Sequence, residues 1–253
     1  MFSGKTVCII TGASRGLGKS IALNFSNLFT KDSVFILLAR DDKSLSDTKQ
    51  AISQKCVTQY FDQGTLDQSV FDSLLPRCLN ELHVNTEEFE HACIVHNAGT
   101  LECEMTEDLV SVQSVSNYFN VNLIGAVALN ASFLRVFQHV EHKLVIGISS
   151  LAALQPINSW ALYCSAKAAR DMYFKHVASE YPAIRVLNYA PGPLRTDMLT
   201  KTACTESKDP QVLKVFKDLA AKALSCDTSV LKLIEILKGN KFKNGDHVDY
   251  YDE

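Results

Sequence analysis

The sequence predicts an α/β protein built on one doubly wound, Rossmann-like parallel sheet with helices on both faces. Short, almost continuously apolar and β-branched runs alternate with amphipathic runs of helical length, which is typical of strands buried on both faces. A glycine-rich turn follows the first of these runs directly. Because neither a Pro/Gly-rich linker nor an internal repeat divides the chain, we expect a single domain over residues 1–253.

The expected elements alternate in order along the chain. The expected strands are residues 6–10, 34–39, 57–61, 92–96, 144–148 and 184–189. The expected helices are residues 16–29, 44–53, 68–82, 112–137 and 161–179, followed by 212–223 and 229–237. The tail, residues 247–251, can add a last strand.

Composition excludes several function classes. A net charge of −3, from 25 basic and 28 acidic residues, creates no overall field that would attract nucleic acid or an anionic membrane. The eight cysteines and seven histidines show no metal-ligand spacing, which indicates free thiols in a reducing compartment and no bound metal. No signal segment precedes the first strand, and no apolar run approaches the roughly 20 residues of a membrane span. We expect a soluble, cytoplasmic protein.

The turn after the first strand, residues 11–18, carries glycines in a Gly-x-x-x-Gly-x-Gly spacing. Glycines let the backbone pass close to a ligand, and the first turn of the following helix offers unpaired N–H groups to a phosphate. The candidate cofactor-binding residues of this turn are Gly12, Ser14, Arg15, Gly16, Leu17 and Gly18.

The same turn contains a second motif. Residues 12–16 fit the Gly-x-Ser-x-Gly elbow that presents the nucleophilic serine of α/β-hydrolases, with Ser14 as the serine. A hydrolase would also need an Asp–His pair downstream, and no such pair is evident in the sequence. The dinucleotide-binding interpretation is therefore favoured over the hydrolase.

The end of the second expected strand indicates which dinucleotide binds. A carboxylate there would bind the ribose hydroxyls of NAD, whereas Arg40 can pair with the 2′-phosphate of NADP. Arg15 of the glycine turn can face the same phosphate. The two arginines favour NADP(H), although Asp41 and Asp42 stand beside Arg40 and would oppose this preference.

Three further residues predict a site that delivers a proton to a carbonyl. Tyr163 and Lys167 are four residues apart on an expected helix and therefore lie on one face. An ammonium near a phenol stabilises the phenolate, which makes the tyrosine a usable acid. Ser150 follows the fifth expected strand, at the sheet edge where a substrate would bind.

The chain resembles the short-chain dehydrogenase/reductase family over essentially its whole length. The resemblance rests on the order and spacing of seven motifs: residues 11–18, residues 96–99, Asn122, Ser150, Tyr163, Lys167 and residues 191–192. His96 departs from the asparagine that is frequent at that place, which we expect to affect local packing.

The resemblance implies a role for each matched residue. Tyr163 would protonate the bound substrate carbonyl and also contact the cofactor, Ser150 would bind and orient the carbonyl, and Lys167 would tune Tyr163 and bind the nicotinamide ribose. Asn122 would support the lysine through a water; the alternative is a helical asparagine that bonds its own backbone. The remaining cofactor contacts implied are Asp62 at the adenine, Asn97, Ala98 and Gly99 beside the cofactor, and Leu194, Thr196, Asp197 and Met198 on the nicotinamide side.

Four longer blocks resemble those members of the family that reduce pterin ketones. They are residues 148–156, 160–164, 185–193 and 247–252. In such enzymes an aspartate of the last block holds the guanidine-like edge of the pterin, a role that would fall to Asp249, while Gly192 would leave space for the substrate. NADPH-dependent reduction of a pterin side-chain ketone is the expected activity. The alternatives are a broader carbonyl or diketone reductase and a non-catalytic NADP sensor.

Two segments and one partner complete these expectations. Residues 194–209 are polar, follow a strand's carboxyl end and are expected to form a loop that acts as a substrate lid. Residues 240–253 are the expected substrate-anchoring segment. The resemblance also implies a homodimer, packed through the helices expected at 112–137 and 161–179.

Overall fold

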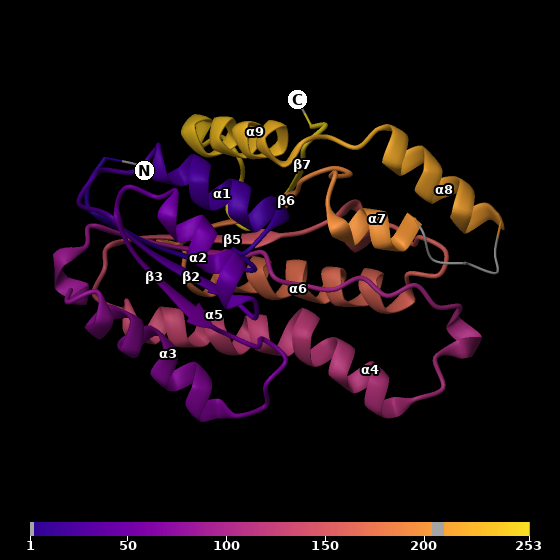
Figure 1. Ribbon diagram of the computed structural model, residues 1–253, viewed down its shortest axis with the longest axis horizontal. Helices are drawn as coiled ribbons and strands as arrows, with labels where there is room; N and C mark the ends of the chain where they lie inside the picture. The colour runs from indigo at the N-terminus through magenta and orange to yellow at the C-terminus, as the bar shows by residue number, and fades with distance from the viewer. Residues whose placement is uncertain (1–2, 204–209, 253) are drawn as a thin grey trace.

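A seven-stranded parallel sheet forms the centre of the protein, as seen in the computed structural model, which describes residues 3–203 and 210–252 (Figure 1). The spatial order is β3-β2-β1-β4-β5-β6-β7, and every neighbouring pair is parallel. The strands are β1 Thr6–Thr11, β2 Val34–Ala39, β3 Lys55–Tyr60, β4 His91–His96, β5 His142–Ile148, β6 Arg185–Ala190 and β7 His247–Asp249. The predicted fold class is confirmed, and the tail does supply a seventh strand.

The strand order creates the crevice that positions the site. From β1 the chain runs outward to β2 and β3, then returns to β4 on the other side of β1. Loops at the carboxyl ends of β1 and β4 therefore diverge, and ligands of doubly wound sheets bind at this switch point. All six residues of β1 and of β2 are buried, as the apolar runs predict.

Helices cover both faces of the sheet (Figure 1). Helices α1 and α9 pack with α2 on one face, and α3, α5 and α6 pack on the other. The bounds are α1 Gly16–Ser26, α2 Asp42–Gln50, α3 Gln68–Glu81, α4 Val112–Phe119, α5 Gly125–Val136, α6 Ala161–Glu180, α7 Asp197–Ala203, α8 Pro210–Ala221 and α9 Cys226–Gly239. Each face has its own continuous apolar core, which explains the near-continuous hydrophobicity of the strands.

The single helix predicted over residues 112–137 is interrupted. A π-helical segment, Asn120–Ile124, separates α4 from α5. The side-chain amide of Gln63, from the loop after β3, donates to the Val121 carbonyl at 2.6 Å inside this segment. Gly125 permits the approach, because a Cβ there would lie 1.8 Å from the Gln63 carbonyl oxygen. The wider turn thus has a specific tertiary partner, which hydrophobic periodicity does not reveal.

By length and composition, the continuous helical stretch Val112–Val136 could cross a membrane. It is the one such stretch among the described residues. Leu129 and Phe133 of this stretch are fully buried against the sheet. Core helices that pack in this way pass the same test of length and composition.

The loop predicted over residues 194–209 is partly wrong, because Asp197–Ala203 forms helix α7. Asp197 lies in its first turn, where the helix dipole stabilises a negatively charged carboxylate. The Thr200 hydroxyl donates to the Thr196 carbonyl at 3.1 Å. Residues 204–209 of the expected lid lie outside the described residues.

The close approach at Gly125 leads to a stability prediction. We expect Gly125→Ala to lower the free energy of unfolding by about 1–3 kcal/mol, because the added methyl group overpacks against backbone. The measurement is urea unfolding followed by circular dichroism. Gly239→Ala is the matched control, since nothing lies within 4 Å of its Cβ position, and it should be neutral or stabilising by about 0.4–1 kcal/mol. Equal stability of wild type and Gly125→Ala would contradict this packing.

Candidate active site

The glycine turn between β1 and α1 is shaped for a close ligand. Gly12 and Gly16 adopt φ values of +67° and +55°, which L side chains rarely occupy. A Cβ at Gly18 would lie 2.2 Å from the Gly12 carbonyl oxygen, so only glycine lets α1 start so close to the turn. Within the described part of the chain no side chain caps the N-terminus of α1 at Arg15, which leaves its first N–H groups available to a phosphate. The turn fits the dinucleotide predicted from the sequence.

Asn97 and Ala98, at the carboxyl end of β4, hold this turn from the side. The Asn97 amide donates to the Thr11 carbonyl at 2.9 Å, and the Thr11 hydroxyl accepts from the backbone N–H groups of Asn97 and Ala98 at 3.0 and 2.9 Å. Gly99 continues the loop, with its Cβ position 2.9 Å from Asn122 Oδ1. The polar side chains here fix the backbone of both loops at the switch point.

The other predicted cofactor residues lie around the turn in different ways. Ser14 is half-buried within it, whereas Leu17 packs its side chain into the core and can offer a ligand only its backbone. A threonine of the α7 region also reaches the turn, since Thr196 Cγ2 lies 3.3 Å from the Cβ position of Gly16. Met198 is 39% exposed on α7. Asp62 accepts a hydrogen bond from the Gly64 N–H at 3.0 Å and so shapes the loop after β3.

The two arginines predicted to bind the 2′-phosphate differ in their partners. Arg15 Nη1 pairs with Asp197 Oδ2 at 2.5 Å, which joins the glycine turn to α7. Arg40 is exposed at the end of β2, and no hydrogen bond or ion pair is recorded for it among the described residues. Asp41 does not pair with Arg40, because its carboxylate accepts from the backbone N–H and the hydroxyl of Ser44 at the start of α2. Of the two acids beside Arg40, Asp41 is thus the N-cap of α2, and Asp42 lies in the first turn of that helix.

Ser150, Tyr163 and Lys167 meet at the carboxyl end of β5. Lys167 Nζ lies 5.4 Å from the centre of the Tyr163 ring and donates to the Ile148 carbonyl at 2.6 Å. Ser150 begins the short helical turn Leu151–Ala153 and accepts from the Ala152 N–H at 3.2 Å. The spacing on α6 therefore brings phenol, ammonium and hydroxyl to one place, as the sequence predicts.

Burial dominates the electrostatics of these groups. Burial raises the pKa of Tyr163 to about 12, although the Ser150 hydroxyl and the Arg170 guanidinium oppose this shift. Burial also lowers the pKa of Lys167 to about 7, and Arg170 acts in the same direction while Asp171 opposes it. At neutral pH Tyr163 thus carries its proton, which is the state that a proton donor requires.

Arg170 is a functional neighbour that sequence reasoning missed. Its guanidinium donates to the carbonyls of His96 at 2.6 Å and Ala98 at 3.1 Å, and it is 2% exposed. His96 in turn bonds Asn130 at 3.2 Å, and burial beside Arg170 lowers the pKa of His96 to about 3, so this imidazole stays neutral. The three-residue spacing from Lys167 was the available signal, because it places Arg170 on the same helix face.

Asn122 is buried in the π-helical segment and bonds the loop after β4. Its Oδ1 accepts from the Thr100 N–H at 2.9 Å, and its Nδ2 donates to the Thr100 hydroxyl at 2.9 Å and the Tyr118 carbonyl at 3.1 Å. The bond to Tyr118 is the local backbone bond given above as the alternative. The water-mediated support of Lys167 remains a prediction.

Asp249 and Gly192 lie together at the edge formed by β6 and β7. Asp249 pairs in register with Ala190, and its half-buried carboxylate accepts from the Tyr251 N–H at 3.0 Å. Gly192 has a φ of +72°, and a Cβ there would lie 3.5 Å from the Tyr251 ring. The segment after β7 therefore packs directly over the Pro191–Gly192 turn. Asp249, the predicted substrate anchor, and Gly192, predicted to leave space for the substrate, thus lie at one edge of the site.

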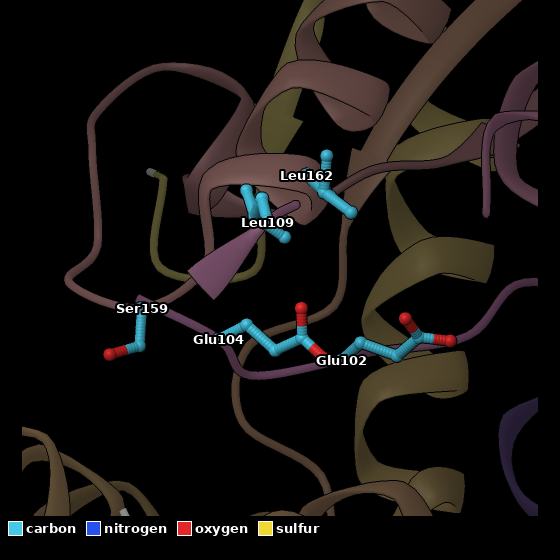
Figure 2. A pocket seen from close by; sticks show the side chains of 5 residues that line it. All are labelled: Glu102, Glu104, Leu109, Ser159 and Leu162. Atoms are coloured by element: carbon cyan, nitrogen blue, oxygen red, sulfur yellow. The ribbon is translucent and has the colours of Figure 1, made fainter. Parts of the chain in front are cut away.

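An apolar aromatic cluster adjoins Tyr163. The Trp160 ring meets the Tyr163 ring edge-on at 5.3 Å and the Phe216 ring of α8 at 5.3 Å, with Leu199 and Leu219 packed against them. Figure 2 shows a small hollow lined by Leu109, Leu162 and Ser159, with the side chains of Glu102 and Glu104 on a neighbouring segment. Burial and the neighbouring Glu104 raise the pKa of Glu102. The cluster supplies a flat, apolar wall beside the proton donor.

Known proteins match this chain over most of its length. Residues 6–207 match the short chain dehydrogenase family. Sepiapterin reductase of Bos taurus is 37% identical over 265 residues, covering 99% of this chain and 96% of the relative, and that of Xenopus laevis is 35% identical, covering 98% and 97%. Benzil reductase ((S)-benzoin forming) of Bacillus subtilis (strain 168) is 28% identical, covering 83% and 84%.

The fold has close counterparts among solved structures. The KRED1-Pglu enzyme superposes with a TM-score of 0.83 at 25% identity, covering 96% of this chain and 100% of that one. The chain therefore belongs to the short chain dehydrogenase family, and it is similar to sepiapterin reductases along almost its entire length.

Proposed function

We propose that this protein is an NADPH-dependent reductase of pterin side-chain ketones, acting on sepiapterin and 6-pyruvoyl-tetrahydropterin in tetrahydrobiopterin biosynthesis. The observation that carries the proposal is the meeting of Ser150, Tyr163 and Lys167 beside the glycine turn. The similarity to sepiapterin reductases supports the pterin, and the family's use of NAD(P) supports the nicotinamide cofactor.

The chain's own residues would manage the proton of this reduction. When bound, the nicotinamide supplies the hydride. Ser150 donates a hydrogen bond to the substrate carbonyl and orients it, and Tyr163 passes its phenolic proton to the carbonyl oxygen. The Lys167 ammonium stabilises the phenolate left on Tyr163. The aromatic wall of Trp160 and Phe216 excludes water from one side of this transfer.

Removing the proton donor tests this mechanism. We expect Tyr163→Phe to lower kcat with sepiapterin by about 10²–10⁴-fold, the usual contribution of a positioned general acid. NADPH should still bind, as measured by quenching of protein fluorescence, because the glycine turn is untouched. Tyr181→Phe, at the exposed end of the same helix, is the matched control and should keep full activity. Undiminished turnover by Tyr163→Phe would refute the assignment.

Asp249 separates a pterin reductase from a broader diketone reductase, which the benzil reductase relative keeps open. Its carboxylate can accept two parallel N–H bonds from a pterin edge, whereas a diketone offers none. The carboxylate lies on the strand beside Ala190, next to the Pro191–Gly192 turn.

Neutralising this carboxylate should therefore affect one substrate class. We expect Asp249→Asn to lower kcat/KM for sepiapterin by about 100-fold, the loss of roughly 2–3 kcal/mol of charged hydrogen bonding. Benzil turnover should be unchanged. The absorbance of NADPH follows both reactions. Equal loss for both substrates would indicate a damaged fold, and wild-type turnover of benzil without sepiapterin would favour the diketone reductase.

The preference for NADPH over NADH would come mainly from Arg40. Its side chain is exposed beside the carboxyl end of β2, where a 2′-phosphate is expected, and Asp41 is occupied by Ser44. We expect Arg40→Met to raise the Kd for NADPH by about tenfold, with the Kd for NADH unchanged. Arg77→Met on α3 is the control for a lost surface charge. Equal weakening of both cofactors by Arg40→Met would contradict this role.

A homodimer would pack through α5 and α6. An apolar hollow between α6 and the start of α5 is lined by Leu123 and Ile124 of the π-helical segment, Val127 of α5, and Ala169, Met172, Tyr173 and His176 of α6. Ile124 is 45% exposed and Met172 is 65% exposed, so the single chain leaves these side chains in water. A second copy covering this face would bury them, and because α6 carries Tyr163 and Lys167, it would also brace the catalytic helix.

A further inference from the structure

A buried polar cluster behind the catalytic residues has no part in the mechanism above. It consists of Ser149 at the end of β5, Asp171 on α6 and His247 on β7. The Ser149 hydroxyl donates to Asp171 Oδ2 at 2.8 Å, and His247 Nδ1 bonds the same oxygen at 2.6 Å. The side chains of His247 and Asp171 are only 12% and 14% exposed. A carboxylate buried in this way is costly unless it is paired and hydrogen-bonded, and Ser149 and His247 supply these partners.

The three residue types are those of a hydrolase triad, but the geometry is not. In a triad the histidine uses Nε2 toward the serine and Nδ1 toward the aspartate. Here the Ser149 hydroxyl lies 3.4 Å from Nδ1, and both groups donate to one aspartate oxygen. Nε2 of His247 is buried without a partner among the described residues. The cluster therefore holds a carboxylate in place and does not activate a nucleophile.

The held carboxylate shares helix α6 with two buried basic side chains, Lys167 and Arg170, and among the described residues its ion pair is with His247. Tyr163, Lys167 and Asp171 follow one another at intervals of four residues along α6, so Asp171 lies one turn behind Lys167 on the same helix face. Arg170 is the second buried cation and bonds only backbone carbonyls. Asp171 opposes the loss of charge that burial and Arg170 impose on Lys167.

The groups around this carboxylate come from several elements. Lys167 and Arg170 belong to its own helix, Ser149 directly follows β5, the Ile148 carbonyl bonded by Lys167 ends β5, and His247 belongs to β7. Asn188 of β6 donates to the Asp171 backbone carbonyl at 3.4 Å. The neutral His96 of β4 reaches this region only through Arg170. Among these groups Asp171 is the one anion.

The cluster also connects the two ends of the proposed site. His247 and Asp249 are two residues apart on β7, and alternate residues of a strand face the same side. The strand that carries the proposed pterin anchor is thus fastened to the catalytic helix by His247 and Asp171.

We propose that Asp171 is a positioning residue for the reaction: its carboxylate, fixed by Ser149 and His247 one helical turn from Lys167, is the anion that favours the charged form of Lys167 beside Tyr163. This inference rests on the proposed function only where it treats Lys167 as part of the catalytic site. The charge state of Lys167 itself is measurable without any turnover.

Asp171→Asn separates charge from hydrogen bonding. Both donors bond Oδ2, so an asparagine oxygen in that place can accept both bonds while the negative charge disappears. We expect the titration midpoint of Lys167 in the cofactor-free protein to fall by about one pH unit. Carbon-13 labelling of lysine Cε with NMR detection gives this midpoint, and Lys167→Arg identifies the signal. The alkaline limb of kcat/KM should move to lower pH by the same amount.

Two further variants complete the experiment. Asp171→Glu keeps the charge and should restore the midpoint toward that of wild type. Glu180→Gln is the matched control, because Glu180 is a histidine-paired carboxylate on the same helix, 3.1 Å from His176, but exposed. It should leave the midpoint and the pH profile unchanged.

Each outcome decides the proposal. A Lys167 midpoint that is the same in Asp171→Asn and wild type would overturn it, as would equal shifts in Asp171→Asn and Asp171→Glu, which indicate a purely structural residue. A shifted midpoint in a protein that turns over no pterin would support the role of Asp171 and refute the proposed substrate instead.

Discussion

Two basic side chains buried beneath the carboxyl edge of the sheet determine how the rest of the site is arranged. Lys167 and Arg170 of α6 donate to backbone carbonyls of β5 and of the β4 loop. A buried charge is costly unless it is hydrogen-bonded and compensated. These bonds fix α6 against the strand ends, and this contact in turn fixes where Tyr163 stands relative to Ser150. The catalytic geometry is therefore a consequence of satisfying buried charge.

The fold was predictable because its signals are local and repeated. Buried parallel strands read as apolar runs, and the helices between them show their own periodicity. The meeting of Tyr163 with Lys167 was predictable for the same reason, since a helix determines which residues share a face. Even the short strand β7 could be anticipated from its alternating block at the tail.

The remaining features depend on contacts between segments far apart in the chain. The π-helical turn at Asn120–Ile124 is stabilised by Gln63, and this distant partner cannot be inferred from the hydrophobic periodicity of residues 112–137. From the sequence Asp41 is expected to repel the 2′-phosphate of NADP, whereas in the structure its carboxylate caps α2 by accepting from the Ser44 N–H. The Ser149, Asp171 and His247 cluster joins residues nearly one hundred positions apart, so sequence reading found no Asp–His pair. Such partners are specified by the assembled sheet and by no single segment.

The position of His247 on β7 has a consequence for how this scaffold can acquire new substrates. In the proposed site residue 249 would meet the substrate, while residue 247, on the same short strand, bonds Asp171 of the helix that carries Tyr163. A library that randomises position 249 alone would explore specificity with the proton-delivery machinery intact. Grafting the whole tail from a relative with another specificity would exchange both at once, so loss of activity in such a chimera would not mean that the new tail binds poorly. The edge strand is best engineered one position at a time.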